Sequence, residues 1–465
     1  MVWIARAAVA AVLAGASVGV LAQQPAPWTV KPEWVKAHEE FLASDVLAGR
    51  GSATRDEEIA ATYVASEFEG YGLKTAPGMS SYIQSAELQG PMLNGHAQLV
   101  AGDQTFVEGK DFDLLMVGGG ATSGRVLKVP ASDAGSKSDL QQNAVLLTDV
   151  ATNRALGSAR ELSGAQAAMI LLPEDASTDR MLTMFGGKPR VPAALKEGQL
   201  KPGRGTVLAL YPEAYKKLLA VKQSSPISLK LFGTNQTERK TYNAIGYLKG
   251  TDPNAGTILL TAHLDHLGTG KPVNGDGIWN GANDDAAGTT AVLEMAHALA
   301  AGPKLRRSVL FVCYGSEEMG EFGSLYFGAH SPVPLKELIA NLEFEMIGNQ
   351  DPKMPKGVLL LTGYDRSNLG PTLKEHGALV GPDPYPEEHF FERSDNYQLA
   401  LKGVVAHTAA GWGTVPTYHQ PDDDLAHLDL PFMTTAIQSL IEPIRWLASS
   451  DFVPKWNHGG QPKGD

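Results

Sequence analysis

The chain has 465 residues, of which 43% are hydrophobic and 19% are charged, and its formal net charge is −12. A chain of this length exceeds one ordinary hydrophobic core, which predicts two domains or one large domain with an insertion. The composition excludes a disordered chain, and the acidic balance argues against nucleic acid as the main partner. The single cysteine, Cys313, excludes an intrachain disulfide, and its apolar surroundings predict a buried, inert thiol.

Residues 1–22 have the pattern of a cleaved secretory signal. Arg6 precedes an apolar stretch from Ala7 to Leu21, which ends at the small residue Ala22. The stretch is short and rich in alanine for a membrane span. We therefore expect export to the periplasm or the medium. Stable membrane insertion is not expected, because no later segment reaches the roughly 18–20 apolar residues of a span.

Residues 86–238 differ from the rest of the chain in their pattern of residue types. Short β-rich runs such as AVLLTDV and AAMILLPE alternate with Gly, Asp and Ser, and His96 is the only histidine in the stretch. These features predict a β-rich inserted domain that binds or covers a ligand, with the chemistry located elsewhere. Gly118-Gly119-Gly120 lacks the ending of a phosphate loop and is predicted to be a flexible turn.

From residue 240 onward, strands alternate with helices. The runs TILLTAH, SVLFVCYG and NLEFEMIG are typical of buried strands, and Ala286–Ala301 is typical of a helix. Upstream, residues 33–72 predict two helices separated by a Gly/Ser turn. The alternation predicts an α/β fold, with a mixed, mostly parallel sheet flanked by helices and a smaller inserted β-rich domain. The predicted division is a signal peptide at 1–22, a discontinuous main domain at 23–85 and 239–455, an insert at 86–238 and a flexible tail at 456–465.

Imidazoles and carboxylates gather at the predicted strand ends. His263 and Asp265 follow the first strand, Glu317 and Glu318 follow the second, and Glu345 lies near the end of the third. Ligands of open α/β sheets collect beyond the carboxyl ends of the strands, and these residue types suit zinc. The sequence therefore predicts a two-metal hydrolytic site. Its remaining candidates are Asp284 and Asp285 in a Gly-Ala-Asn loop and His419 in a loop rich in Pro and Asp.

A pair of metal ions about 3.5–4 Å apart needs a bridging carboxylate and terminal ligands on each ion. Asp284 suits the bridge because it is short and lies in the Gly-Ala-Asn loop that caps the predicted helix. Taken singly, Asp284 or Asp285 would be a helix N-cap, and the two roles can coexist. Asp265, two positions after His263, can orient that imidazole, whereas His266 is assigned neither role.

Several assignments stay open at this point. Glu317 and Glu318 directly follow a buried strand, so that one can bind metal while its neighbour accepts a proton from water. Glu343 and Glu345 face the same side of a strand, so that either could be a ligand. His419, taken alone, would be a surface histidine.

The motifs HLDH, GANDDAAG, GSEE and YHQPDDD, in this order, resemble those of the zinc-dependent aminopeptidases with a co-catalytic metal pair. Glutamate carboxypeptidases and glutaminyl cyclases are relatives of the same fold. The resemblance covers residues 33–80 and 240–450. The segment 86–238 is similar to the protease-associated domain found in many such enzymes. A zinc exopeptidase-like fold carrying that insert is therefore implied.

The resemblance implies a ligand set for two zinc ions per chain. Asp284 would bridge them, His263 and Glu345 would complete one ion, and Glu318 and His419 would complete the other. The best-known members place Asp at position 345, where this chain has Glu. This departure leaves the choice between the two glutamates of that strand open.

Other roles are implied in the same way. Glu317 would be the general base, and Asp265 would support the first histidine ligand. Tyr418 resembles a tyrosine that stabilises the tetrahedral intermediate in some relatives, although ordinary loop packing is an equal alternative. The peptide bond between Asp284 and Asp285 is expected to be cis.

These implications predict an exported metallo-exopeptidase. As an aminopeptidase, it would remove N-terminal residues from peptides with a water activated by two zinc ions and a Glu general base. The alternatives are a carboxypeptidase or dipeptidase of the same fold, a glutaminyl cyclase, and a non-catalytic binding protein. Peptides are the expected partners, and no oligomeric state is predicted.

Overall fold

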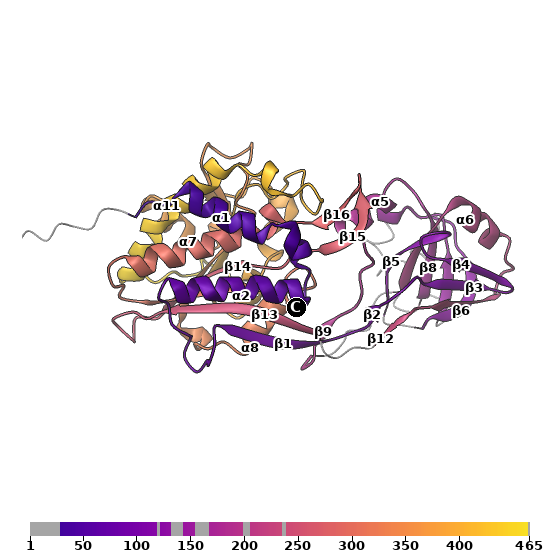
Figure 1. Ribbon diagram of the computed structural model, residues 1–465, viewed down its shortest axis with the longest axis horizontal. Helices are drawn as coiled ribbons and strands as arrows, with labels where there is room; N and C mark the ends of the chain where they lie inside the picture. Colours follow the sequence, from indigo (N-terminus) through magenta and orange to yellow (C-terminus); the bar gives the residue numbers. More distant parts are fainter. Residues whose placement is uncertain are drawn as a thin grey trace, which may run out of the picture.

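The computed structural model describes residues 28–118, 121–131, 143–153, 167–198, 205–234 and 239–463. The predicted signal at 1–22 and two of the three consecutive glycines at 118–120 lie outside these residues. Figure 1 shows two lobes, joined by extended segments and by the hairpin of β15 (Gly268–Val273) and β16 (Asp276–Trp279). We call them the α/β lobe and the β-rich lobe.

The α/β lobe is built on a mixed sheet of nine described strands. Its centre is parallel, with β17 beside β14, β14 beside β18, and β18 beside β21, while antiparallel strands flank it. The sheet confirms the predicted fold class. Across the sheet the strands are β20 (Val380–Pro382), β19 (Leu359–Leu361), β21 (Ala406–Ala410), β18 (Leu338–Glu345), β14 (Thr257–His263), β17 (Ser308–Tyr314), β13 (Arg239–Leu248), β1 (Ile83–Gln89) and β9 (Ala194–Leu195).

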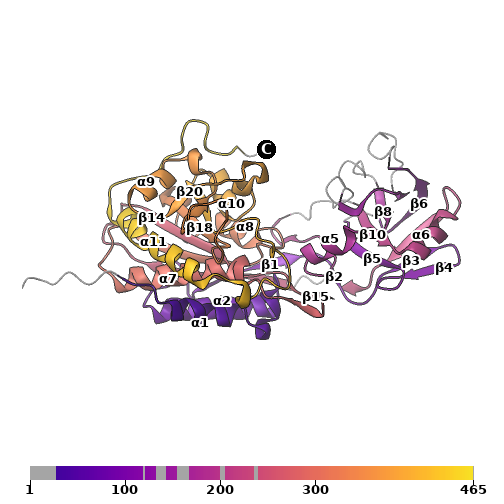
Figure 2. The same cartoon turned by 90° about the horizontal axis from the view of Figure 1, so that it is seen from above.

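Helices cover both faces of this sheet, which is why the central strands β14 and β17 are largely apolar. Every residue of β14 and β17 is buried, including Cys313, whose thiol is free as predicted. Figure 2 shows α2 and α10 on opposite sides of β14 and β18. One face carries α1 (Pro32–Leu42), α2 (Arg55–Gly70), α7 (Ala287–Ala301), α9 (Leu369–Glu375) and α11 (Leu430–Ser449), and the other carries α8 (Phe322–Ala329) and α10 (Asn396–Leu401).

The β-rich lobe contains a second sheet, of eight described strands. Leu218 of α6 (Pro212–Leu219) packs on one face, and Leu182 of α5 (Thr178–Met184) packs on the other. Across this sheet the strands are β4 (Gln104–Val107), β3 (Gln98–Ala101), β11 (Pro226–Lys230), β6 (Ser123–Lys128), β7 (Ala144–Leu147), β8 (Ala167–Pro173), β10 (Thr206–Leu210) and β5 (Phe112–Met116).

The chain leaves the α/β lobe through β1 and returns to it through β13. These two strands pair with each other antiparallel, so that Ile83 faces Ala244 and Leu88 faces Arg239. Strand β9 pairs with β1, so the segment 86–238 also contributes strand residues to the larger sheet. The short sheet of β2 (Met92–Leu93) and β12 (Gly233–Thr234) lies where both connections approach the β-rich lobe.

Residues 456–463 differ from the predicted flexible tail. Trp456 pairs with Ser367 as an isolated bridge, and its ring centroid lies 5.4 Å from that of His407. The backbone N–H of Asn457 donates to the Arg366 carbonyl at 2.8 Å. The contact of the Trp456 ring and the backbone hydrogen bonds hold this segment against the lobe, although a Gly- and Pro-rich sequence is typical of a disordered terminus.

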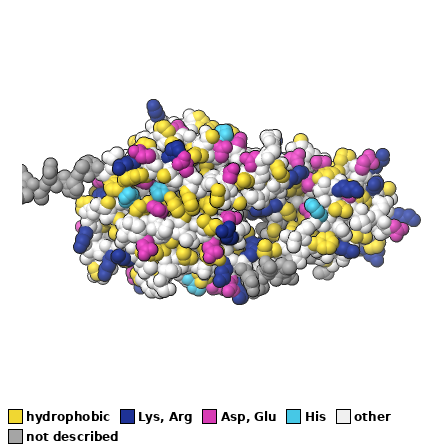
Figure 3. All heavy atoms as spheres, viewed as in Figure 1, with side chains coloured by type: hydrophobic (Ala, Val, Ile, Leu, Met, Phe, Trp, Pro, Cys, Tyr) yellow, Lys and Arg dark blue, Asp and Glu magenta, His cyan; other side chains and the backbone are white. Residues whose placement is uncertain are grey.

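The surface carries charged side chains of both signs. Acidic and basic side chains are interspersed on the face seen in Figure 3, where neither sign dominates a broad area. Among the described residues, no helix combines the length and the apolar character that crossing a membrane requires.

Candidate metal centre

Three central strands place candidate residues at one edge of the sheet. His263 ends β14, Glu345 ends β18, and Glu317 comes three residues after β17 ends at Tyr314. The strands run parallel, and His263 lies in register with Tyr314. Their carboxyl ends therefore meet, as predicted for a ligand site in an open α/β sheet.

Asp284 lies between two histidines. One carboxylate oxygen, Oδ1, is 3.2 Å from His263 Nε2, and the other, Oδ2, is 3.2 Å from His419 Nε2. The Asp284–Asp285 peptide bond is cis, as expected. Gly281, with φ +59°, precedes the turn, and a Cβ there would lie 2.5 Å from the His266 ring. A carboxylate that offers its two oxygens to two different imidazoles has the geometry of a bridging ligand.

One candidate ligand group consists of His263, Asp284 and Glu345, whose ligand atoms all lie within 4.8 Å of one another. Glu343 does not belong to it. That side chain is fully buried further down β18, where Ser394 Oγ donates to Glu343 Oε1 at 3.2 Å. The structure thus brings Glu345, and not Glu343, to the other two side chains.

A second candidate group consists of His266, Asp284 and Glu318. His419 adjoins it, with Nε2 only 3.1 Å from Glu318 Oε2. His266 Nδ1 lies 2.8 Å from Glu318 Oε1. Sequence reasoning assigned no role to His266. The only available signal was its position in HLDH, one residue after Asp265.

The donor atoms of these groups fit metal ions. Several buried atoms lie close to one another without the angles of a hydrogen bond: His263 Nε2, both ring nitrogens of His266, Asp284 Oδ2 and Glu318 Oε1. Leaving one such atom unsatisfied costs about 1–3 kcal/mol, so a cluster of them indicates a site for a ligand. Imidazole nitrogens with carboxylate oxygens are the donor set of zinc.

The imidazoles of the cluster hold two of its carboxylates in their charged form. Burial alone would raise the pKa of Asp284, but the imidazoles of His263 and His419 outweigh it and hold that pKa well below its usual range. Burial is likewise outweighed at Glu318, where His419 and His266 lower the pKa to about 2. At Glu345, burial dominates and raises the pKa to about 7.

Asp265 connects the end of β14, which carries His263, to the loop that carries Glu317. Its Oδ1 accepts the backbone N–H of Glu317 at 3.0 Å, and its Oδ2 accepts Ser52 Oγ at 2.5 Å. Its Oδ1 is also 3.7 Å from His263 Nδ1, which lies closer, at 3.2 Å, to the Asp265 carbonyl oxygen. The carboxylate therefore positions the Glu317 backbone most directly, and the imidazole more loosely.

Two further carboxylates that sequence reasoning missed hold the same loops. Glu57 on α2 accepts the backbone N–H of Ser316 at 3.1 Å and its hydroxyl at 2.8 Å. Asp423 accepts the N–H groups of Asn283 and Asp284 at 2.9 and 3.0 Å. Asp423 lies in the YHQPDDD motif, which is a usable signal, whereas nothing distinguishes Glu57 from the other acidic residues of its helix.

Arg50, which the sequence did not single out either, connects three segments of the chain. Its guanidinium is fully buried and donates to the carbonyl oxygens of Leu264 at 2.9 Å, Asn280 at 2.6 Å and Gly281 at 2.9 Å. It also donates to the carbonyl of Leu42. The loops that carry the histidine and aspartate ligands are thus joined through one side chain.

We expect Arg50→Met to lower the free energy of unfolding by about 2–5 kcal/mol, because four buried carbonyls lose their charged donor. Urea unfolding followed by circular dichroism measures the change. Arg50→Lys should be intermediate, since one ammonium cannot reproduce the fork of the guanidinium. Arg55→Met is the matched control, because the Arg55 side chain is 83% exposed. Equal midpoints for Arg50→Met and Arg55→Met would contradict the expectation.

The β-rich lobe closes the site on one side. The His419 ring stacks on Tyr418 with 3.9 Å between centroids, and its Nδ1 is 2.9 Å from the carbonyl oxygen of Met184, at the end of α5. Because a carbonyl only accepts, Nδ1 is the donor, and Nε2 is left to face Asp284. The inserted segment therefore orients one of the candidate ligands.

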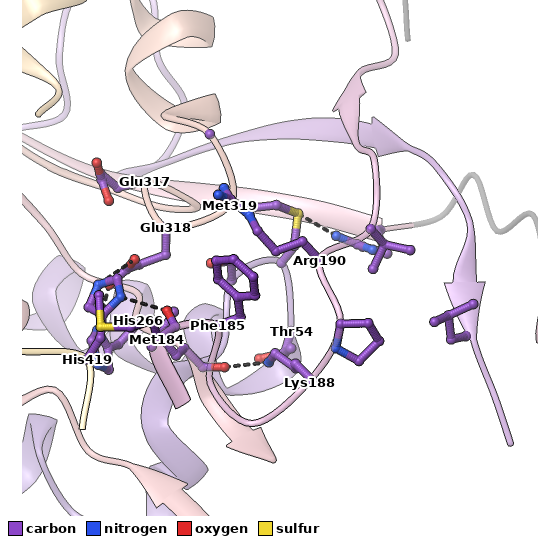
Figure 4. Close-up of a pocket in the computed structure, with 18 of the residues that line it drawn as sticks. Thr54, Met184, Phe185, Lys188, Arg190, His266, Glu317, Glu318, Met319 and His419 are labelled. Atoms are coloured by element: carbon purple, nitrogen blue, oxygen red, sulfur yellow. Dashed lines mark hydrogen bonds and ion pairs between the residues drawn. The ribbon is translucent and has the colours of Figure 1, made fainter. Parts of the chain in front are cut away.

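A cavity of about 760 Å³ lies between this closure and the cluster. Glu317, Glu318, His266 and His419 line it together with residues of the β-rich lobe (Figure 4). Tyr418 lines this cavity and also a smaller one beside Glu345. The cluster is therefore accessible from a space large enough for a small ligand.

A third acidic group, Asp113, Glu174 and Asp179, lies in the β-rich lobe. It contains no histidine. Lys271 Nζ is 3.4 Å from an Asp113 oxygen and 3.7 Å from an Asp179 oxygen, so a protein cation already offsets part of its charge. This group is an ion-pair cluster in which Asp113 is buried and the other two carboxylates are exposed.

Comparisons with known proteins agree with this geometry. Residues 243–442 match the family model described as peptidase family M28. Leupeptin-inactivating enzyme 1 of Streptomyces exfoliatus is 35% identical over 169 residues, which cover 35% of this chain and 34% of that protein. Aminopeptidase YwaD of Bacillus subtilis is 28% identical over 276 residues, which cover 58% of this chain and 54% of that protein. The chain thus spans about a third to a half of these relatives' length.

Solved structures show the same fold over nearly the whole chain. BSAP, a zinc aminopeptidase from Bacillus subtilis, has a TM-score of 0.60 at 17% identity, covering 91% of this chain and 96% of that one. An aminopeptidase from Aneurinibacillus sp. strain AM-1 has a TM-score of 0.59 at 18% identity, covering 90% and 94%. The similarity to peptidase family M28 covers residues 243–442 of this chain.

Proposed function

We propose that this protein is a zinc-dependent aminopeptidase with two zinc ions per chain. The observation that carries the proposal is the position of Asp284 between two histidines, each accompanied by a glutamate. Glu318 and His419 of this arrangement also line a large cavity. His263, Asp284 and Glu345 would hold one ion. Asp284, Glu318 and His419 would hold the other, with His266 beside them.

When bound, such a metal pair polarises the carbonyl of the scissile bond and lowers the pKa of the attacking water. Glu317 would take the proton from that water and return it to the leaving amine. Its carboxylate accepts no hydrogen bond within the described part of the chain, and it lines the cavity. Asp265 fixes the Glu317 backbone, which sets where the carboxylate points. The Tyr418 hydroxyl would donate to the developing oxyanion.

The proposal also covers the rest of the chain. Residues 86–238 would be a protease-associated insert that walls the cavity, supported by the eight-stranded sheet and by the contact from Met184 to His419. Export follows from the signal pattern of residues 1–22 alone. Peptides are the proposed substrates.

A metal analysis combined with a substrate panel tests this function. We expect about two zinc ions per chain and chelator-sensitive release of the N-terminal residue from peptides with a free amino terminus. N-acetylated peptides should be inert. Release of the C-terminal residue from those blocked peptides would indicate a carboxypeptidase instead. Cyclisation of N-terminal glutamine without hydrolysis would indicate a glutaminyl cyclase.

A further inference from the structure

The cavity beside the metal cluster contains three cations that the proposed chemistry does not use. Lys188 and Arg190 come from the loop that follows α5, and Arg239 begins β13. None of the three forms an ion pair with a carboxylate in the described part of the chain. Lys271, just outside the cavity, by contrast has two carboxylates within 4 Å.

These cations contact neutral groups. Lys188 Nζ donates to the Leu267 carbonyl, and Arg239 Nη2 lies 2.6 Å from the sulfur of Met319. The Arg190 guanidinium lies 5.3 Å from the centre of the Phe185 ring. Burial lowers the pKa of Arg239, because its guanidinium is partly removed from water. Partly buried cations that have no carboxylate partner favour the binding of an anion in the cavity.

None of these three contacts involves a proposed metal ligand. Figure 4 shows Glu318 and His419 at the left of the view and Arg190 nearer its centre. A peptide whose first carbonyl lies at the metal cluster would extend its leaving part into the remaining space. That space is bounded by these cations and by apolar side chains such as Met181 and Phe185.

We propose that Lys188, Arg190 and Arg239 bind a carboxylate on the leaving part of the peptide. The proposal rests on the function proposed above and deepens it by naming a substrate class. Two sources share this chemistry. One is an acidic side chain just after the scissile bond, and the other is the C-terminal carboxylate of a very short peptide. Arginine favours carboxylates in particular, because its planar fork matches both oxygens.

Matched substrates separate the two sources. With X as the preferred first residue from the panel above, X-Glu-amide is compared with X-Gln-amide, and X-Ala is compared with X-Ala-amide. We expect kcat/KM to be about tenfold higher for the charged member of at least one pair. A preference in the first pair identifies the side chain as the source, and one in the second identifies the terminal carboxylate. Ratios near one in both pairs would overturn the proposal.

Variants assign the preference to these residues. Arg190→Gln combined with Arg239→Gln should reduce the ratio to about twofold or less while the rate for X-Gln-amide stays within about twofold. The matched control combines Lys216→Gln and Lys217→Gln, which removes two exposed charges from α6 of the same lobe. The control should keep the wild-type ratio. An unchanged ratio in the arginine double variant would exclude these side chains as the binding site.

Salt gives a second measurement that needs no variant. An electrostatic preference should fall as sodium chloride is raised from about 0.05 to 0.5 M, because screening shortens the reach of the cations. A preference that is independent of salt would contradict the proposal even if the double variant did not fold. Failure of the proposed function is distinguishable, because no member of either pair would then be hydrolysed.

Discussion

Glu317→Gln is expected to keep its bound metal and to lose about 10²–10⁴-fold in kcat, the range typical of removing a general base. The amide retains the shape of the side chain but cannot accept the proton. Burial raises the pKa of the Glu317 carboxyl, and the neighbouring Glu318, Asp395 and Glu345 add to this effect. A carboxylate in such surroundings is a stronger base than one in water.

The measurement is steady-state turnover of an unblocked peptide, with metal content determined on the same preparation. Glu337→Gln, an exposed acid in the same lobe, is the matched control and should have wild-type turnover. If Glu317→Gln retains near-normal turnover with full metal, the residue has no part in the mechanism. Loss of metal together with activity would instead make Glu317 a positioning residue for the cluster.

The second large effect is expected at Glu345. Glu345→Ala should lower bound zinc from two ions per chain towards one and reduce kcat about 10²-fold or more. Glu343→Ala should keep both ions, because Glu343 is buried against Ser394 and does not join the candidate ligands. The pair is well matched, since both residues lie on the same face of β18.

Zinc per chain, measured after gel filtration in metal-free buffer, decides between the two glutamates. The reverse result would assign the ligand role to Glu343. Two ions in both variants would mean that the first zinc is held by other groups. His263→Ala should resemble Glu345→Ala, because both side chains belong to the same ligand group.

Much of the framework could be predicted because its signals are local. The strand that ends at His263 is a largely apolar run, which is the pattern of a strand buried on both faces. Carboxyl ends of parallel strands meet at one edge, so the residues that follow them were expected to lie together. The approach of His263 to the end of β18 was expected for this reason, whereas the choice of Glu345 over Glu343 stayed open.

Other parts depend on long-range contacts that leave no pattern in the sequence. Arg50 reaches the carbonyl of Leu264 across 214 positions, and backbone acceptors carry no residue identity. The proximity of His266 to Glu318 depends on how a loop turns, for which no periodicity exists. Ser316 and Met346 adopt positive φ at the ends of their strands, although neither is a glycine. Such conformations concentrate at functional sites and are enforced by surroundings that a linear sequence does not display.

The pairing of β1 with β13 has a consequence for the order in which the molecule can fold. During synthesis, β1 emerges first but lacks β13, the neighbour with which it pairs over most of its length, until the whole segment that separates Gln89 from Arg239 has been made. The β-rich sheet lies almost entirely within that segment, so it can form while the edge of the larger sheet is still incomplete. Closing so long a loop costs less entropy when its interior is already compact. The inserted lobe therefore serves as a folded spacer that brings two distant strands within reach of each other.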